Sequence, residues 1–448
     1  MTKTQTTKTN HYFRALVALA ALAMMAIIFA ASSANASTTF TVNSTGDQPD
    51  MTPNDSICDA DQATGTQCTL RAAIQQANVA AGADVINFNI SGTGVHTISP
   101  SSELPPISDT VAIDGYTQPG ASPNTLAKGT NAVIKVSLVG TNAGAGASGL
   151  SFVGLSDSKV RGLAINHFST GVFVDATATF LVVEGNFIGT DPSGTTDQGN
   201  QSAGVFVSGP SVTIGSRGPE GRNLISGNDG SGIRLGGAAS QSQVVGNLIG
   251  TEKSGTKNLG NSREGVEIIA SSYNFVQNNT IAFNGGDGVK VSGGGRSSPD
   301  SSGDSILSNS IFSNGGLGIN LVDVLAPEGG SEIEANDPGD ADTGPNGLQN
   351  KPVLTVAKTV SGKTTIKGKL NSHPNETYAI QLFSNPPGTN EGRKLIAEKN
   401  ITTDGSGNRS FTLLPAKVAV GRNITATATR NSTSDTSEFS APRKVVAS

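Results

Sequence analysis

The sequence predicts an all-β protein, in which a solenoid of stacked β coils is followed by a small β-sandwich. Three observations lead to this fold class. A sixteen-residue phrase occurs at 185–200 and again at 246–261, with ten identical positions in the same register. Between residues 158 and 321, short aliphatic strands recur at intervals of 24–37 residues, with no helix-length amphipathic pattern between them. After residue 351, longer alternating runs replace these repeats. Such repeats are typical of solenoids, whose coils bury a continuous core only when stacked.

Residues 1–36 have the pattern of an export signal peptide. Three basic residues and no acid precede the apolar run 15–31, and the small residues 34–36 have the spacing of a signal-peptidase site. A retained membrane anchor is the alternative, but 17 apolar residues barely span a bilayer. We therefore expect a secreted or cell-surface protein whose mature chain begins at Ser37 and has no transmembrane segment.

Residues 38–82 are expected to cap the open N-terminal end of the solenoid core. Thr69 is placed to N-cap a helix that Gly82 would end. The apolar face of this helix consists of Leu70, Ala73, Ile74 and Ala77. The sequence has two cysteines, Cys58 and Cys68, and in an exported protein a pair this close predicts one disulfide.

Residues 83–322 are predicted to form the solenoid. In each of six coils one strand has an aliphatic, a variable and a second aliphatic residue, so alternation points the aliphatic side chains inward. These triplets are 172–174, 205–207, 233–235, 266–268, 289–291 and 319–321. Two columns of turn residues accompany them: Asn200, Asn228, Asn261, Asn284 and Asn314, with His167 in the first coil, and Asn186, Asn223, Asn247, Asn279 and Asn309. Asn tolerates left-handed backbone, and stacked Asn side chains can bond one another.

The repeated phrase is interpreted as one coil with an expanded turn. The expansions 189–200 and 250–261 occur in alternate coils, so they should project from the same side, roughly 10 Å apart. Loops on a rigid solenoid often carry function. The alternative is a hairpin that only covers a sheet edge.

The variable residues of the six triplets form one predicted outward column: Phe173, Phe206, Arg234, Glu267, Lys290 and Asn320. Two exposed phenyl rings beside cations would make a platform for an extended anionic polysaccharide, with Phe173, Phe206, Arg234, Glu267 and Lys290 as the binding residues. The alternatives are a solvated charge ladder, or rings packed under a loop such as 189–200.

The segment 323–350 breaks the coil pattern and is rich in acids. Asp337, Asp340, Asp342 and Asn346 are oxygen donors spaced like a calcium loop, although no Glu closes it as in an EF-hand. Calcium is therefore the one cofactor that the sequence suggests, and a flexible acidic linker is the alternative. A second acidic stretch before the predicted helix also offers donors: Asp47, Asp50, Asp55, Asp59 and Asp61.

Residues 351–448 are predicted to form an immunoglobulin-like β-sandwich, without the two cysteines of a true immunoglobulin domain. The predicted strands are 353–359, 363–370, 377–384, 393–402, 409–414 and 423–429. This part has 14 Lys and Arg against 6 Asp and Glu, whereas residues 37–350 have 13 against 29. The acidic solenoid disfavours nucleic acid as a partner, and the basic end suits an anionic cell-envelope component.

The stretch "CDADQATGTQCTLRAAIQQAN" at 58–78 resembles the CSLREA-type N-terminal domain of bacterial exported proteins, with Thr69 and Ala72 departing from its signature. "IDGYTQPGA" at 113–121 and the V-x-x-N-x-I coils resemble right-handed parallel β-helix repeats of the pectin-lyase-like superfamily. Together the resemblance covers about residues 38–350. It implies a right-handed parallel β-helix, and it specifies no activity.

That superfamily also includes polysaccharide lyases, epimerases and glycosidases, so catalysis is the alternative function. Inverting glycosidases need two carboxylates, one as acid and one as base. The chain has neither an Asp-Asp pair nor a His-Gly pair, and no motif joins the lyase-like candidates Asp287, Glu264 and Arg234. We therefore assign no catalytic residue and expect a non-catalytic surface protein that binds polysaccharide or an envelope partner.

Overall fold

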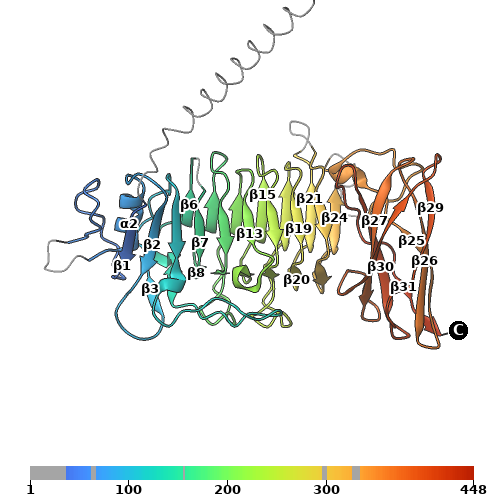
Figure 1. Ribbon diagram of the computed structural model, residues 1–448, viewed down its shortest axis with the longest axis horizontal. Coiled ribbons are helices and arrows are strands. Elements are labelled where there is room, and N and C mark those ends of the chain that lie inside the picture. Colours follow the sequence, from blue (N-terminus) through green and yellow to red (C-terminus); the bar gives the residue numbers. More distant parts are fainter. Residues whose placement is uncertain (1–36, 62–66, 155–156, 295–299, 325–332, 448) are drawn as a thin grey trace, which may run out of the picture.

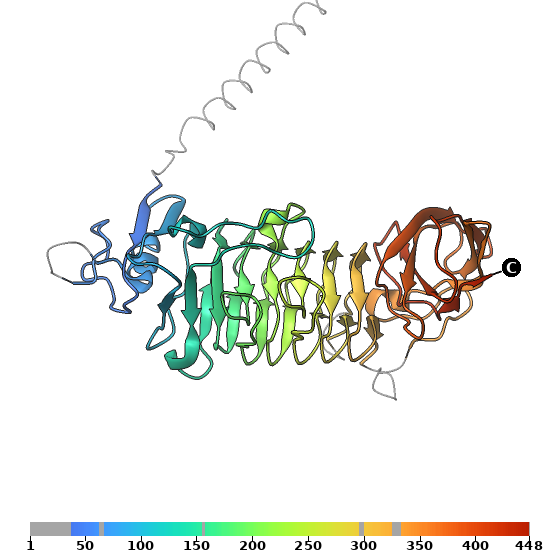
Figure 2. The same ribbon diagram turned by 90° about the horizontal axis from the view of Figure 1, so that it is seen from below.

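The computed structural model describes residues 37–61, 67–154, 157–294, 300–324 and 333–447. The signal-peptide prediction falls outside these residues. The molecule is elongated: coils stack in chain order along its length, and a separate unit closes the C-terminal end (Figures 1 and 2). None of the helices in the described part is long and apolar enough to cross a membrane.

Three parallel sheets run the length of the solenoid, which confirms the all-β prediction. The first has nine strands: β1 (Thr39–Val42), β2 (Asp84–Phe88), β4 (Val111–Asp114), β7 (Lys159–Arg161), β10 (Val182–Glu184), β13 (Thr213–Gly215), β16 (Gln243–Val245), β19 (Phe275–Gln277) and β22 (Ser305–Leu307). The second has eight: β3 (His96–Ile98), β5 (Val136–Val139), β8 (Leu163–Asn166), β11 (Phe187–Ile188), β14 (Leu224–Ile225), β17 (Leu248–Ile249), β20 (Thr280–Ala282) and β23 (Ser310–Phe312). The third has seven: β6 (Ser148–Phe152), β9 (Thr170–Val174), β12 (Ala203–Val207), β15 (Ser231–Gly236), β18 (Val266–Ile269), β21 (Val289–Ser292) and β24 (Ile319–Val322).

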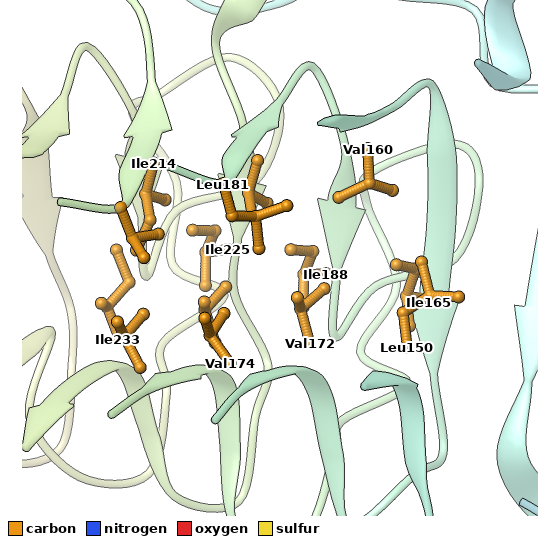
Figure 3. Close-up of a cluster of buried hydrophobic side chains, with 14 of the residues drawn as sticks. Leu150, Val160, Ile165, Val172, Val174, Leu181, Ile188, Ile214, Ile225 and Ile233 are labelled. Carbon is orange, nitrogen blue, oxygen red and sulfur yellow. The ribbon is translucent and has the colours of Figure 1, made fainter. Parts of the chain in front are cut away.

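Aliphatic side chains from all three sheets fill the interior of the solenoid. Figure 3 shows Val160 and Ile214 from the first sheet, Ile165 and Ile188 from the second, and Val172 from the third pointing toward one another. All of them are fully buried. The predicted inward positions of the six triplets are thus confirmed as the core, which the stack buries as one continuous cluster.

The glycine before each of the first five triplets is required because neighbouring coils approach closely there. A Cβ at Gly204 would lie 2.6 Å from the carbonyl oxygen of Gly232 on the next coil. A Cβ at Gly265 would lie 2.7 Å from the carbonyl oxygen of Gly288. Real Cβ atoms do not come this close, so close backbone contact between coils explains why glycine occupies this position.

Both Asn columns form continuous hydrogen-bond ladders along the solenoid. Each Nδ2 donates to the Oδ1 of the Asn one coil further on: Asn200 to Asn228 (2.9 Å), Asn228 to Asn261 (2.8 Å), Asn261 to Asn284 (2.8 Å) and Asn284 to Asn314 (2.9 Å). The second column runs in the same way from Asn186 to Asn309. These Asn residues are therefore structural, and His167 is a turn residue with φ +59°.

The N-terminal end is covered by helix α2 (Leu70–Ala77) and stapled by the predicted Cys58–Cys68 disulfide, which is confirmed. The Thr69 side chain caps the helix by accepting from the Ala72 N–H, as predicted. The predicted end at Gly82 is wrong, because the helix stops at Ala77. Asn78 bonds the backbone of Pro106 and Ser108, which turns the chain away. Strand β1 pairs with β2, so the predicted cap also contributes the edge strand of the first sheet.

The C-terminal unit consists of two four-stranded sheets packed around a shared core. One contains β25 (Val353–Val360), β26 (Lys363–Asn371), β29 (Asn408–Leu413) and β32 (Val446–Ala447). The other contains β27 (Thr377–Asn385), β28 (Leu395–Thr402), β30 (Asn423–Arg430) and β31 (Arg443–Lys444). The pairings are antiparallel except between β25 and β32.

The C-terminal unit is bonded to the last coil through polar contacts. Ile311 on β23 forms an antiparallel bridge with Gly392. Glu391 is 7 % exposed and accepts from the Asn314 side chain (3.0 Å), so it ends the first Asn ladder. The Thr436 hydroxyl accepts from the Ile306 N–H at 2.9 Å. This unit therefore covers the open C-terminal end of the solenoid core.

Candidate functional site

The outward column lies on the third sheet as predicted. Its residues are direct partners on successive strands: Ser151, Phe173, Phe206, Arg234, Glu267, Lys290 and Asn320, with Ser151 adding one position to the prediction. Successive backbones are roughly 4.8 Å apart, so neighbouring side chains are in contact. The outward column is therefore one continuous strip that crosses seven strands.

The N-terminal half of the outward column is an aromatic and cationic stack. The rings of Phe173 and Phe206 have centroids 5.5 Å apart and are tilted by 58°. The Arg234 guanidinium lies 5.3 Å from the Phe206 centroid, within range of a cation–π interaction. Both rings are half-buried, so they are less exposed than the sequence suggested. The partly exposed rings and the exposed Arg234 side chain still present an aromatic and cationic surface to solvent.

The C-terminal half of the outward column is a compensated charge network. Arg234 pairs with Glu267 at 3.6 Å, as the alternating charges predict. The expected partnership of Glu267 with Lys290 is replaced, because Lys290 pairs with Glu264 from the preceding turn at 3.7 Å. The Ser231 hydroxyl lies 3.0 Å from Glu264 and 3.2 Å from Glu267. These carboxylates are already neutralised, so this half of the column is not a cationic surface.

Asn320 does not extend the exposed strip. Its side chain is 6 % exposed, and its Nδ2 donates to the Asp287 carboxylate at 2.9 Å. The other Asp287 oxygen accepts from the Leu317 N–H. The exposed part of the outward column therefore ends at Lys290, and Asp287 is a turn residue bonded within the coil stack.

The two expanded turns lie on the same side of the solenoid, two coils apart, as predicted. Their flanking strands β11 and β17 both pair with β14. The turns also contact each other, because the Lys253 N–H donates to the Gly194 carbonyl at 3.0 Å. The long loop 117–135 runs beside them, where the Thr130 N–H donates to the Lys253 carbonyl (Figure 1). The two expanded turns and this loop therefore support one another along one side of the solenoid.

Three of the four predicted metal ligands come together. Asp337, Asp340 and Asp342 each place a carboxylate oxygen within 4.8 Å of the others. Burial raises the pKa of Asp340. Burial, together with Asp337, Asp340 and Glu334, raises the pKa of Asp342 to about 6. Repulsion of this kind is what a bound divalent cation would relieve.

The individual carboxylates differ in how far they are satisfied. Asp340 is 2 % exposed, and its oxygens accept from the Asn350 N–H and the Ser372 hydroxyl. The Oδ1 atom of Asp342 is buried and has no hydrogen-bond partner. His373 lies at the edge of the cluster, with Nε2 3.9 Å from Asp340. The unpartnered oxygen is the atom that a cation would engage first.

Asn346, the fourth predicted ligand, has a different role. It is fully buried, its Oδ1 accepts from the Asp304 N–H at 2.9 Å, and its Nδ2 donates to the Asp304 carbonyl at 2.8 Å. It therefore continues a third polar ladder, in which Asn274 bonds the Asp304 carboxylate. Since Asp340 and Asn346 are buried, the described part of 323–350 is also not the flexible linker that composition suggested. The acids before α2 bond protein groups too: Asp47 pairs with Arg71, and Asp50 accepts from Gln76.

A basic cavity that sequence reasoning did not predict lies beside the second sheet. It has a volume of about 540 Å³ and lies between loop 127–129, strands β17, β20 and β23, and the C-terminal unit. Five cationic residues line it: Lys128, Arg222, Arg393, Lys394 and Arg422. They are scattered over almost 300 positions of the chain. In the sequence, only the net positive charge of residues 351–448 indicates a cationic surface.

Comparisons with known proteins leave the family open. No protein-family model matches the chain, and no curated protein matches it in sequence.

Proposed function

We propose that this chain is an exported, non-catalytic surface protein that binds an extended polysaccharide along its solenoid. The proposal includes a right-handed parallel β-helix of the pectin-lyase-like type, a CSLREA-like N-terminal cap and an immunoglobulin-like C-terminal sandwich. The three parallel sheets and the closing two-sheet unit support this reading. An anionic glycan or another cell-envelope component is the proposed partner.

The observation that carries the proposal is the stack of Phe173, Phe206 and Arg234. Aromatic faces bind the apolar faces of sugar rings, and a guanidinium binds carboxylates through paired donors. A strip that repeats every coil suits a ligand that is itself a chain. The neighbouring carboxylates, Glu264 and Glu267, are each held by a cation and by Ser231, so they are poorly placed for acid–base catalysis.

The test is retention of the mature protein on immobilised polygalacturonate. Phe206→Ala should weaken retention roughly fivefold, corresponding to about 1 kcal/mol of lost stacking. Phe180→Ala is the matched control, because Phe180 is 59 % exposed and lies outside the outward column. Retention should not change in the control.

The same experiment separates binding from structure. Arg234→Ala should reduce retention and leave the melting temperature nearly unchanged, because exposed pairs contribute at most about 1 kcal/mol. If both variants lost stability in step with retention, the stack would be structural. Undiminished retention in the double variant would remove the outward column from the proposal.

We also propose that Asp337, Asp340 and Asp342 bind a divalent cation such as calcium, supported by the unpartnered Asp342 oxygen. Calorimetry of the full mature chain should detect calcium binding that Asp342→Asn abolishes. Affinity should fall as the pH drops through about 6, because Asp342 then takes up a proton. The control is Asp229→Asn, at an exposed turn. A titration without heat at millimolar calcium would refute the site.

A further inference from the structure

The basic cavity is a groove whose walls come from distant parts of the chain. Its floor is formed by outward residues of neighbouring strands, Leu248, Thr280 and Ser310, which are direct partners in the second sheet. Lys128 and Arg222 stand at one end. At the other end are residues of the C-terminal unit. From β17 to β23 is two strand spacings, so the floor of the groove is about 10 Å long. It lies on a different sheet from the outward column.

The lining of the groove has a single sign of charge. Five Lys and Arg side chains line it, and no Asp or Glu does. Among the described residues, none of the five takes part in an ion pair. This is unexpected in a chain with more acidic than basic residues. Cations that converge on one cavity without counter-charges raise the local concentration of anions.

The three arginine side chains of the groove are held in place by groups other than carboxylates. Arg222 donates to the carbonyls of Gly246, Leu126, Ala127 and Gly129, and burial lowers its pKa. The Arg393 guanidinium rests 4.4 Å from the ring centroid of Phe312. Arg422 donates to the side chain and the carbonyl of Ser384. The three guanidinium groups are thus fixed before any ligand arrives, which lowers the entropic cost of binding.

The carboxylate of Glu391 does not neutralise the groove. Glu391 is two residues from Arg393, but its carboxylate points into the junction and accepts from Ser313 and Asn314. The side chains of Lys128 and Lys394 are exposed and form no hydrogen bond or ion pair within the described residues. Lys128 lies on the solenoid loop and Lys394 lies on the C-terminal unit. The two free ammonium groups therefore face the same ligand space from two separate parts of the protein.

The chemistry of the lining indicates the class of ligand. Besides the cations it presents the exposed amide of Asn278 and the half-buried hydroxyl of Thr280, which match the hydroxyls of a sugar chain. Phe312, the single aromatic residue of the lining, is already covered by Arg393. Single-stranded nucleic acid would need free aromatic faces for its bases. The groove therefore suits a linear acidic glycan better than a nucleic acid.

We propose that this groove binds a linear acidic glycan, which bridges the solenoid and the C-terminal unit. The site is separate from the outward column and does not depend on it. Because the ligand would contact both walls, its binding also stabilises the junction between the two parts, in proportion to its affinity.

The test uses Lys128→Gln with Lys394→Gln in the mature chain. Both side chains are exposed and unbonded, so folding should not change. The matched control is Lys367→Gln with Lys369→Gln, which removes two exposed cations from β26, outside the groove. The probes are fluorescent oligogalacturonate, a heparin oligosaccharide, neutral dextran and single-stranded DNA, measured by fluorescence anisotropy at low salt. The carboxylated and sulfated probes show which acidic group the groove takes.

At least one of the two acidic glycans should bind the wild type and the control alike. It should bind the groove variant at least tenfold more weakly, and added salt should weaken binding steeply. It should also raise the melting temperature of the wild type but not of the groove variant. Because only the groove bridges the two parts, the melting shift reports the groove and not the outward column. Phe206→Ala should keep this shift, so failure of the column proposal would not affect this result. Equal affinity in the groove variant, tighter binding of DNA than of glycan, or bound glycan without a melting shift would overturn the proposal.

Discussion

Replacing Asp304 by Asn should make the protein more stable at high pH. Asp304 is fully buried in the third polar ladder, where its Oδ1 accepts from the backbone and side chain of Asn274. Its Oδ2 is buried and has no partner. Burial, together with the nearby Asp435 carboxylate, raises the pKa of Asp304 to about 8. Asn at this position keeps the ladder acceptor and carries no charge.

The sign and magnitude follow from the pKa shift. A carboxyl whose pKa is raised by folding contributes stability that is fully present below its unfolded pKa of 3.8 and is lost as the pH rises to about 8. A rise in the pKa from 3.8 to about 8 corresponds to a loss of unfolding free energy on the order of 5 kcal/mol at high pH. Wild type and Asp304→Asn should therefore be equally stable near pH 4. Above about pH 8 the variant should be more stable by roughly that amount.

Urea unfolding followed by circular dichroism, at a series of pH values between these limits, measures the difference. Asp229→Asn is the control for removing one charge, because Asp229 is exposed. Other buried acids such as Glu438 remain in both proteins, so only the difference between them reports Asp304. A difference that did not change with pH would refute the assignment of a buried, protonated carboxyl.

The remaining predictions concern the two ends of the solenoid. Cys58→Ser with Cys68→Ser should cost about 2–3 kcal/mol of stability and promote aggregation by exposing the core, measured by melting and light scattering; an unchanged protein would contradict the capping role. Glu391→Ala should cost about 3 kcal/mol, because three donors lose their acceptor, whereas Glu391→Gln should cost less; equal urea midpoints for both variants would contradict this. Gly265→Ala should abolish soluble expression or lower the melting temperature sharply, and a neutral effect would contradict close coil contact.

The repeated part of the fold could be predicted because equivalent positions have the same structural role in every coil. The triplet alternation placed Val172 and Val174 in the core and Phe173 outside, and strand register confirms this. The Asn columns could also be predicted from the sequence, because a hydrogen-bond ladder needs the same side chain at the same position of every coil. Six predicted strands of the C-terminal unit likewise match β25–β30 within two residues at each end.

The rest could not be predicted because it depends on contacts that occur once. Glu391 bonds Asn314, which is 77 positions away in sequence, and Lys128 lines the same groove as Lys394. No periodic pattern in the sequence predicts either contact. Asn346 looked like a metal ligand by spacing alone. The structure uses it to end a ladder whose other members lie in the solenoid. The spacing of residues in the sequence predicts the repeated coils, but it does not predict which non-repeated loop packs against them.

The Asn ladders have a direction, and that direction makes solenoid length adjustable. At every rung the donor faces the C-terminal end and the acceptor faces the N-terminal end. Glu391 can only accept, so it terminates the series, whatever the number of rungs before it. A coil inserted or deleted within the series would leave both terminal structures with the same neighbours. Evolution could therefore lengthen or shorten this rod one coil at a time without redesigning either end.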